Sequence, residues 1–383
     1  MRRRFVVLTE IIAPYRIPVF NALAQHPQID LHVIFLADTD PTLRQWHVYA
    51  HEIEFSYEVL PSWRWRIGEY NVLLNRGLTS ALKQAAPEAV LCGGYNYLTS
   101  WECLSWARRN DVRFLLWVES TARDSRNRRA LVELLKKKYI THCDGFVVPG
   151  KSSRQYLLEC GAAGMDIFVA PNAVDNHFFS AAAAARMQDL DLRAALQLPT
   201  RYFLFVGRLV PAKGVFDLLQ AYGMLPPVFR KKIGLVFVGD GVAKSELGRL
   251  AASIWPGSVQ FCGFVQRELL PAYYAFADAL VLPTHSDTWG LVVNEAMACG
   301  LPIVVSDVAG CVADLVDDSW NGRVIHSADS SELAAALAEV AGSSDIRAAM
   351  GARSSERIRA YSPEACANGI ATALFAEEAV AYG

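Results

Sequence analysis

Short apolar runs alternate with amphipathic stretches through the first half of the chain. Brief apolar runs predict strands, and apolar positions that recur every three or four residues predict helices. The predicted strands are Phe5–Leu8, Leu31–Leu36, Ala89–Cys92, Phe114–Val118 and Gly145–Val148. The predicted helices are Ile17–Ala24, Leu73–Ala85, Ser100–Arg109, Ala130–Tyr139 and Ser152–Glu159. This alternation indicates a parallel sheet with helices on both faces.

A second alternating series begins at Tyr202 and indicates another sheet of the same kind. Its further strands are predicted at Gly234–Val238, Ser258–Phe261, Ala279–Leu282, Ile303–Val305 and Gly322–Ile325, and its last helices at Ser331–Val340 and Ser362–Ala379. Between the two series, a turn at Pro171–Asp175 leads into Ala181–Ala185, which we interpret as an inter-domain linker with a hinge near Asn172. The pattern therefore predicts an α/β chain of two doubly wound domains.

Length and composition agree with this fold class. The chain has 383 residues, enough for two domains, and combines 52% hydrophobic with 20% charged residues. A net charge of −2 gives no general attraction to nucleic acid. The eight cysteines form no C-x-x-C pair, so we expect reduced thiols, no zinc site and a cytoplasmic protein. The first apolar run is interpreted as a strand, not a signal peptide, and any membrane contact would be peripheral.

A strand, a loop and a helix follow one another between Ala279 and Gly300. The loop contains Asp287, and the helix that starts near Gly290 carries Glu295 about one turn further in. Amides at a helix start attract anions, while a carboxylate beside them suits sugar hydroxyls. We therefore expect Glu295 to accept from a ribose diol and Asp287 from a sugar. The alternative is a pair of ordinary acids at a helix start.

Two cations lie in the loop that follows the strand ending at Gly207. Arg208 comes directly after this glycine, and Lys213 precedes the next helix. Because the carboxyl ends of strands in open α/β sheets are where ligands bind, the two cations are placed to hold a diphosphate. Solvated surface cations are the alternative. The two acids predicted at the same sheet edge favour the diphosphate clamp.

Four motifs in order along the chain resemble the retaining glycosyltransferases of family 4, which have the GT-B fold. A G-R-x-x-x-x-K-G loop is matched by Gly207, Arg208, Lys213 and Gly214, a V-G-x-G turn by Val238–Gly241, a G-F turn by Gly263 and Phe264, and the E-x7-E signature by Asp287 and Glu295. The resemblance implies two Rossmann-like domains facing a central cleft: residues 1–172 for the acceptor, with residues 362–383 packing back on them, and residues 173–361 for the donor. It also implies donor contacts at Gly207, Gly239, Asp240, Phe264, Val265, Trp289, Gly290 and Leu291.

The resemblance implies transfer of a sugar from a UDP- or GDP-sugar to a glycan, lipid-linked or small acceptor, with retention and without a metal. Arg208 and Lys213 would neutralise the departing diphosphate. The pairs Asp38/Asp40 and Asp189/Asp191 are interpreted as loop and linker residues, not as a metal-binding D-x-D motif. Two other functions remain open: an epimerase or hydrolase of nucleotide sugars on the same fold, and a nucleotide-sugar-binding protein without catalysis.

The chain departs from the family pattern at two places. Asp287 is one methylene shorter than the usual glutamate, and Glu119 stands where a histidine is expected beneath the donor sugar, so Glu119 is a further candidate base or nucleophile. Acceptor contacts are expected from Tyr15, Arg16, Tyr95 and Asn96, at strand ends. Two groups suit an anionic lipid surface or, alternatively, are solvated helix faces: residues 63–66 (Trp-Arg-Trp-Arg), and Arg123, Arg126, Arg128, Arg129, Lys136, Lys137 and Lys138.

Overall fold

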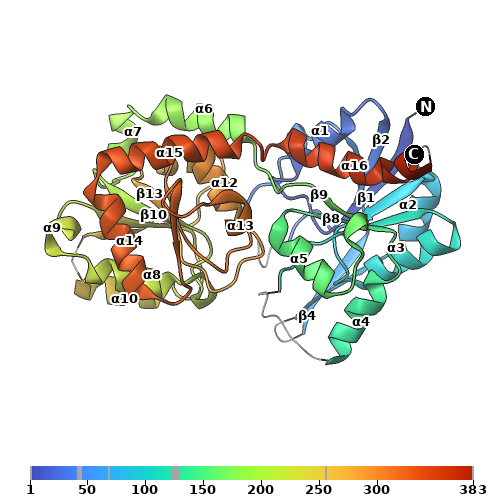
Figure 1. Cartoon of the computed structure of the whole chain (residues 1–383), viewed down its shortest axis with the longest axis horizontal. Coiled ribbons are helices and arrows are strands. Elements are labelled where there is room, and N and C mark those ends of the chain that lie inside the picture. Colours follow the sequence, from blue (N-terminus) through green and yellow to red (C-terminus); the bar gives the residue numbers. More distant parts are fainter. Residues whose placement is uncertain (1, 41–44, 68–69, 123–129, 255–256, 382–383) are drawn as a thin grey trace. The chain divides into compact units, whose positions relative to one another are not determined.

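The computed structural model describes residues 2–40, 45–67, 70–122, 130–254 and 257–381 (Figure 1). The chain divides into two compact units. The first unit comprises residues 1–173 together with 363–383, and the second comprises residues 174–362. Unit 1 is thus built from two separate stretches of sequence, whereas unit 2 is continuous.

Unit 1 contains a parallel sheet with the strand order β3-β2-β1-β6-β7-β8-β9. The strands are β1 (Arg3–Thr9), β2 (Ile29–Phe35), β3 (Ser56–Val59), β6 (Ala89–Cys92), β7 (Arg113–Trp117), β8 (Gly145–Val148) and β9 (Ile167–Val169). The helices are α1 (Ile17–Ala24), α2 (Leu78–Ala85), α3 (Leu98–Arg109), α4 (Ala130–Ile140), α5 (Lys151–Glu159) and α16 (Pro363–Ala381), with short 3-10 turns at Ala50–Glu52 and Gly164–Asp166. The predicted alternation of strands and helices in this half is confirmed.

Each face of the unit 1 sheet has its own hydrophobic core. One face packs against α1 and α16, and the other against α2 and α3. The close approach of α16 depends on Gly369, because a Cβ at this position would lie 2.3 Å from the carbonyl oxygen of Val169. The Nη1 atoms of Arg3 and Arg113 both donate to the carbonyl of Leu374, at 2.8 and 2.9 Å. The last helix is therefore an integral layer of unit 1.

A β-hairpin in unit 1 corrects three of the sequence predictions. It consists of β4 (Ser62–Ile67) and β5 (Tyr70–Asn75), which pair antiparallel. The predicted helix Leu73–Ala85 is wrong in its first turn, because Leu73 belongs to β5 and α2 begins only after Gly77. Residues 63–66 lie in a strand and form no helix face. Asp40 is not a solvated loop residue, since it is 2% exposed and forms an ion pair with Arg64 of the hairpin.

Unit 2 contains a second parallel sheet, with the order β12-β11-β10-β13-β14-β15. The strands are β10 (Tyr202–Val206), β11 (Gly234–Val238), β12 (Val259–Phe261), β13 (Ala279–Leu282), β14 (Ile303–Ser306) and β15 (Gly322–Ile325). The helices are α6 (Asn176–Arg186), α7 (Leu190–Ala195), α8 (Val215–Met224), α9 (Pro227–Arg230), α10 (Lys244–Ile254), α11 (Leu270–Ala275), α12 (Leu291–Ala298), α13 (Val312–Leu315), α14 (Ser330–Gly342) and α15 (Ser344–Ile358). The predicted second series of strands is confirmed.

Two predictions about the helices of unit 2 are wrong. The alanine-rich segment Ala181–Ala185 is not a linker but part of α6, which begins after Asp175, whose carboxylate accepts from the Phe178 N–H at 2.8 Å. Likewise Asp189 is no linker residue, because it caps α7. Helix α15 was missed between the two predicted last helices. Its sequence is rich in polar residues, and its inner face is made of small or scattered residues such as Ser354 and Ile358.

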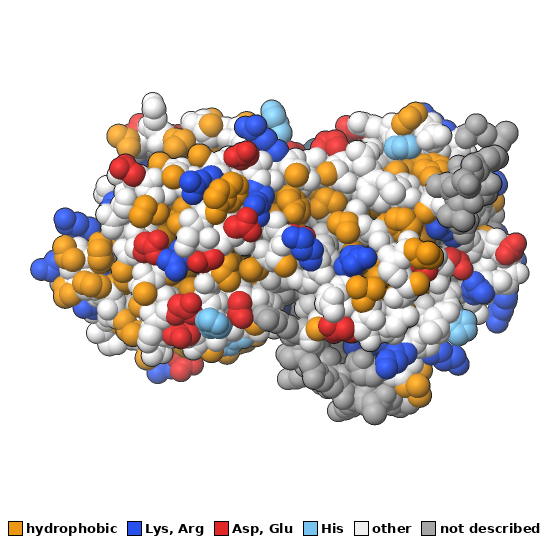
Figure 2. All heavy atoms as spheres, in the orientation of Figure 1, with side chains coloured by type: hydrophobic (Ala, Val, Ile, Leu, Met, Phe, Trp, Pro, Cys, Tyr) orange, Lys and Arg blue, Asp and Glu red, His pale blue; other side chains and the backbone are white. Residues whose placement is uncertain are grey.

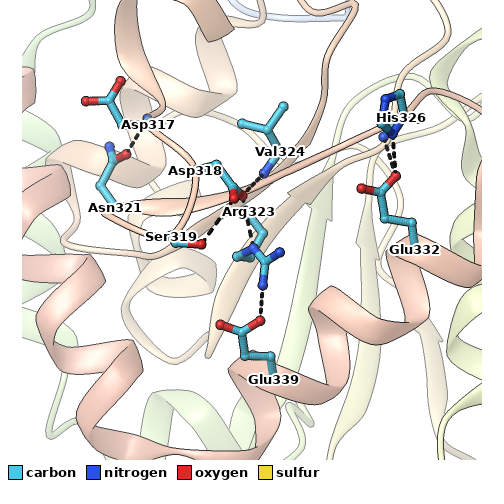
Figure 3. A network of polar contacts seen from close by, with 9 residues as sticks. All are labelled: Asp317, Asp318, Ser319, Asn321, Arg323, Val324, His326, Glu332 and Glu339. Atoms are coloured by element: carbon cyan, nitrogen blue, oxygen red, sulfur yellow. Dashed lines mark hydrogen bonds and ion pairs between the residues drawn. The ribbon is translucent and has the colours of Figure 1, made fainter.

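A polar network fixes β15 at the edge of the unit 2 sheet (Figure 3). The Asp318 carboxylate accepts from the Val324 N–H at 2.9 Å, from Arg323 Nε at 3.0 Å and from the Ser319 hydroxyl at 3.1 Å. Arg323 also pairs with Glu339 of α14. Burial acts to raise the pKa of Asp318, but these hydrogen bonds outweigh it and hold the pKa below its usual value. The network ties the turn before β15 to the strand and the strand to its covering helix.

Candidate functional site

The sequence-predicted motifs of unit 2 gather at the carboxyl edge of its sheet. Strand β10 lies between β11 and β13, so the chain crosses to the other side of β10 at this point. Such a switch point is where open α/β sheets hold their ligands. The loop after β10 leads through the 3-10 turn Pro211–Lys213 into α8, and the loop after β13 leads into α12. Both predicted cations and both predicted acids come from these two loops and from α12.

Glycines allow three loops to pack backbone against backbone at this edge. The Gly207 N–H donates to the Val238 carbonyl at 2.9 Å, and the Gly239 N–H donates to the Gly263 carbonyl at 2.7 Å. Gly239 has a φ of +138°, and a Cβ there would lie 1.9 Å from the Gly207 carbonyl oxygen. Only glycine fits this position. The motif glycines thus bring the ends of β10, β11 and β12 together.

The loops after β10 and β13 are also joined directly. The backbone N–H of His285 donates to the Ala212 carbonyl at 2.9 Å, and the Thr284 hydroxyl donates to the same carbonyl at 3.1 Å. The imidazole of His285 contacts the Asp217 carboxylate of α8 at 2.5 Å. These contacts hold the Lys213 loop against the Asp287 loop.

Lys213 and Asp287 form an ion pair across the switch point. Lys213 Nζ lies 2.5 Å from Asp287 Oδ2, and each side chain is 17% exposed. Nζ also donates to the Ser286 carbonyl at 3.4 Å, while the Trp289 N–H donates to Asp287 Oδ1 at 3.3 Å. The cation and the acid therefore neutralise each other here. Arg208 is exposed on the same loop.

Glu295 lies in the second turn of α12 and is largely buried. Its Oε2 accepts a hydrogen bond from the hydroxyl of Tyr274, a buried residue of α11, at 2.5 Å. Burial raises the pKa of Glu295 to about 7, and the hydrogen bond from Tyr274 offsets part of that rise. Glu295 is thus not a solvated helix residue, while Asp287 pairs with Lys213 and also accepts from the Trp289 N–H close to the helix start.

The remaining predicted donor positions surround this core. Gly290, with a φ of +98°, is the N-cap residue of α12. The first backbone N–H groups of the helix, including that of Leu291, point out of its amino end. Trp289 is buried, and its Nε1 donates to Asn294 Oδ1 at 2.9 Å, so its ring anchors the loop to helix α12. Phe264 is 40% exposed, whereas Val265 packs against the core.

Asp240 lies exposed at the end of β11. Its carboxylate accepts from the Gly241 N–H at 2.8 Å and pairs with Lys244 at 3.1 Å. The Gly241 N–H and the Lys244 ammonium lower the pKa of Asp240. The Asp240 carboxylate is therefore an anion that stabilises the turn in which it lies.

The sheet of unit 1 has a second ion pair at its own carboxyl edge. Arg16, at the start of α1, pairs with Glu119, which follows β7. The guanidinium also lies 3.9 Å from the centroid of the Trp117 ring. The structure thus brings together two residues that the sequence analysis assigned separately. The Glu119 side chain is 38% exposed and the Arg16 side chain 12%, so the carboxylate is the more accessible partner of the pair.

The other predicted acceptor residues lie in different settings. Tyr15 meets the Trp46 ring edge-on with 6.3 Å between centroids. Tyr95 is half-buried against Tyr139, and its carbonyl accepts from Trp101 Nε1 at 3.1 Å. Asn96 is exposed. Tyr95 is therefore partly used by the fold itself.

Sequence reasoning missed several polar residues at these edges. In unit 1, the buried Asp40 pairs with Arg64, and burial together with the nearby carboxylate of Glu10, which follows β1, raises the pKa of Tyr97. In unit 2, Tyr274 was missed. The position of Glu10 directly after a predicted strand was a usable signal. No sequence signal shows that Arg64 reaches Asp40 or that Tyr274 reaches Glu295.

Some predicted features lie elsewhere or outside the described residues. Arg123, Arg126, Arg128 and Arg129 of the basic cluster lie outside them. A polar groove lined by Arg4, His32 and Glu58 is formed by β1–β3 and α2 within unit 1. Within the described ranges, no group of three or more His, Cys, Asp or Glu side chains could hold a metal ion, and no helix is long and apolar enough to cross a membrane.

Comparison with known proteins agrees with this geometry. Residues 191–357 match the family model described as glycosyl transferases group 1. The chain is 34% identical over 147 residues to O-antigen chain mannosyltransferase B of Escherichia coli, covering 31% of this chain and 38% of that protein. It is 35% identical over 170 residues to D-inositol 3-phosphate glycosyltransferase of Streptomyces coelicolor, covering 42% of this chain and 37% of that protein. The chain thus spans less than two fifths of these two relatives.

A solved structure resembles the chain over nearly its full length. It is Anabaena HepE in complex with UDP and glucose, with a TM-score of 0.77 at 16% identity, covering 97% of this chain and 99% of that chain. Together with the two parallel-sheet α/β units, this likeness defines the fold as GT-B. The chain therefore has the GT-B fold, and its residues 191–357 match the model of group 1 glycosyl transferases.

Proposed function

We propose that the protein is a retaining glycosyltransferase of family 4 that transfers a sugar from a UDP- or GDP-sugar to a carbohydrate or lipid-linked acceptor. The observation that carries the proposal is the ion pair of Lys213 and Asp287 at the switch point, 2.5 Å apart, beside the start of α12. Both residues fall within the segment that matches group 1 glycosyl transferases. The HepE complex supports a UDP-sugar as the first donor to test.

In this proposal the donor diphosphate takes the place of Asp287 as the partner of Lys213. Lys213 and Arg208 neutralise the charge that develops on the leaving diphosphate, and the first amides of α12 add to it. Asp287, released from the ion pair, turns to accept from a hydroxyl of the donor sugar. Because Lys213 and Arg208 supply the positive charge, this proposal assigns no role to a metal.

The nucleoside lies along the same edge. Glu295 accepts from the ribose, and the turn around Gly239, Asp240 and Phe264 faces the base. The exposed ring of Phe264 and the glycine-packed backbone leave polar groups of the main chain available for a base edge. Retention follows from attack on the face from which the diphosphate leaves, with the leaving phosphate taking the acceptor proton.

We assign acceptor recognition to unit 1. Glu119 is 38% exposed and pairs with Arg16, so a carboxylate held by a guanidinium is available at this edge, while the buried Trp117 ring lies beneath the guanidinium. Glu119 orients an acceptor hydroxyl in this proposal and is not the base. Tyr15 and Asn96 are further contacts from neighbouring loops.

A peripheral membrane contact is part of the proposal for a lipid-linked acceptor. Trp63 and Trp65 on β4 are 43% and 51% exposed, and Leu134 on α4 is 64% exposed. Lys137 and Lys138 follow on the same helix. Exposed aromatic and aliphatic side chains with nearby lysines suit an anionic interface. Sedimentation with anionic and with neutral vesicles tests this contact, and equal absence of binding to both would refute it.

The reaction is tested by incubating the protein with UDP-glucose and other UDP- and GDP-sugars, with and without EDTA and a panel of saccharide acceptors. We expect a new glycoside by mass spectrometry only when both substrates are present, unchanged by EDTA, with the donor's anomeric configuration by NMR. Conversion of the sugar without an acceptor would instead indicate an epimerase. Tight donor binding without any transfer or hydrolysis would indicate a binding protein.

A further inference from the structure

Tyr274, which contacts Glu295, belongs to none of the four motifs. The contact depends on the packing of three helices. Helix α11 carries Tyr274 and packs against α6, and α12, which carries Glu295, also packs against α6. The Tyr274 ring is fully buried and meets the Phe179 ring of α6 edge-on, with 6.1 Å between centroids. A ring held on several sides places its hydroxyl at a defined point. That point is 2.5 Å from Glu295 Oε2.

The direction of this hydrogen bond follows from the chemistry of the two groups. Burial raises the pKa of Tyr274 well above its ordinary value, so the hydroxyl keeps its proton and donates. Glu295 accepts on Oε2, which leaves Oε1 and the second lone pair of Oε2 for a ligand. A carboxylate in a helix would otherwise turn freely about its side-chain torsions, at an entropic cost when a ligand binds.

The groups around Glu295 make Tyr274 its main polar partner. Helix α6 presents Phe179, and α15 presents the Ser355 hydroxyl, which bonds to the Met297 carbonyl. On its own helix, the Cys299 thiol interacts with Glu295, and burial together with this carboxylate raises its pKa, so the thiol stays neutral. Tyr274 is thus the group that stabilises the ionised form of Glu295 by a direct hydrogen bond.

We propose that Tyr274 is a positioning residue whose hydroxyl aims the Glu295 carboxylate at the ribose of the bound nucleotide. This inference rests on the proposed function. It assigns to a buried residue of α11, outside all four motifs, a share of the recognition of a nucleoside diphosphate. Without the hydroxyl, Glu295 loses both its orientation and the hydrogen bond that favours its ionised form.

The test compares the binding of UDP with that of 2′,3′-dideoxy-UDP by titration calorimetry, from pH 5.5 to pH 8.5. GDP and its dideoxy analogue serve if UDP does not bind. The ratio of the two dissociation constants isolates the ribose hydroxyls from the diphosphate and base. In the wild type we expect a preference of about 10-fold or more at pH 8, the scale of hydrogen bonds to a charged group. This preference should appear as the pH rises through about 7.

Tyr274→Phe should reduce the ribose preference by about 3- to 10-fold, since one oriented, charge-assisted hydrogen bond is removed from the carboxylate. The Tyr274 hydrogen bond lowers the pKa of Glu295, so its loss should move the midpoint of the pH profile upward. Glu295→Gln should abolish most of the preference at every pH. The double variant should lose little more than Glu295→Gln alone, because both changes act through one carboxylate.

The matched control is Tyr222→Phe. Tyr222 is also buried, and its hydroxyl donates to a single acceptor, the Ile233 carbonyl, at 2.7 Å. It should lower stability without changing the ribose preference or the pH midpoint. An unchanged preference and midpoint in Tyr274→Phe would overturn the positioning role alone. Failure of the wild type to bind either nucleotide would overturn the proposed function, and the inference with it.

Discussion

Each sheet places an ion pair of a cation and an acid at its carboxyl edge, but different groups surround the two pairs. In unit 2, Lys213 follows the central strand β10 and pairs with Asp287 after the neighbouring strand β13. In unit 1, Arg16 follows the central strand β1 and pairs with Glu119 after β7, two strands away. The topology is shared, since each pair spans the point where the chain crosses over.

The two ion pairs are surrounded by different chemical groups: main-chain groups in unit 2 and aromatic side chains in unit 1. Glycines at the unit 2 edge bring backbones to within van der Waals contact, so main-chain amides and carbonyls form the surface. At the unit 1 edge, rings of Trp117 and Tyr15 flank the guanidinium. In the proposed function, the backbone surface of unit 2 holds the diphosphate of the donor, and the side chains of unit 1 contact the acceptor. The four motifs of the sequence analysis all lie in unit 2, at the edge formed by the backbone.

The largest expected effect comes from removing the cation of unit 2. Lys213→Ala, or Arg208→Ala, should raise the barrier to transfer by about 2–4 kcal/mol, the scale of losing one preorganised donor to developing charge. Steady-state transfer with a saturating donor measures it. Lys83→Ala, which removes an exposed lysine of α2, is the control and should leave the rate unchanged. Near-wild-type rates in both active-site variants would remove the diphosphate clamp from the mechanism.

A single added methyl group should disrupt the backbone packing that the glycines allow at the unit 2 edge. In Gly239→Ala the new Cβ would lie 1.9 Å from the Gly207 carbonyl oxygen, at a φ of +138°. We expect a loss of about 2–3 kcal/mol in the free energy of unfolding, because the backbone must shift. Gly248→Ala is the control, since nothing lies within 4 Å of its Cβ in helix α10, and it should be neutral or stabilising. Equal denaturation midpoints for the two variants would contradict the packing described for this edge.

Glu295 should make stability and nucleotide binding respond to pH in opposite directions. Its pKa in the folded protein, about 7, lies above its ordinary value of 4.5. The folded protein therefore retains the proton to higher pH, and this group's contribution to stability is full below pH 4.5 and is lost as the pH rises through about 7. Nucleotide binding, which uses the carboxylate, should strengthen over the same range.

Glu295→Gln separates these two effects. It should weaken nucleotide binding about 10-fold at pH 8, the scale of a hydrogen bond to a charged group. It should also flatten the decline in unfolding temperature between pH 5 and pH 8. Thermal unfolding at both pH values, with and without UDP, measures both. Unchanged nucleotide affinity would exclude Glu295 from the ribose site.

The smallest expected effect concerns the aromatic surroundings of unit 1. Arg16→Lys keeps a charge beside Glu119 but loses the planar group over Trp117, and should cost about 1 kcal/mol in acceptor binding. The KM for the acceptor should rise while hydrolysis of the donor in its absence stays unchanged. Arg108→Lys, in the exposed pair with Asp144, is the control. A matching loss of donor hydrolysis would show that the two edges cannot be assigned to separate substrates.

The sequence was sufficient to place the second sheet and the five inner strands of the first, because these strands are apolar runs bounded by polar loops. The edge strands β3 and β9 of the first sheet were not predicted, since β3 is mostly exposed and β9 has only three residues. The proximity of Lys213 and Asp287 was also predictable, since residues after neighbouring parallel strands share an edge. The prediction failed for helices whose buried and exposed faces differ little in hydrophobicity. The alanines of α6 were predicted to be a linker. Helix α15 was missed because its buried face combines the small residues Gly351 and Ser354 with only two large apolar ones, Met350 and Ile358. The start of α2 was misplaced because Leu73 fits either period.

Side-chain pairs between distant elements could not be read from the sequence. Asp40 and Arg64 meet only because the hairpin sets which face of β4 turns inward. Tyr274 reaches Glu295 only because α11 and α12 both pack on α6. These contacts depend on how helices and hairpins dock, which the hydrophobic pattern does not specify.

Because α16 packs on unit 1, this unit cannot complete its fold until the last helix of the described chain has been synthesised. Residues 174–362 form one continuous stretch that contains all of unit 2, so this unit is synthesised in full before α16. Unit 1 lacks the layer that covers α1 and β9 until Pro363–Ala381 leaves the exit tunnel. Its nascent apolar face is therefore exposed for the longest time, and it is the surface at which a chaperone would be needed.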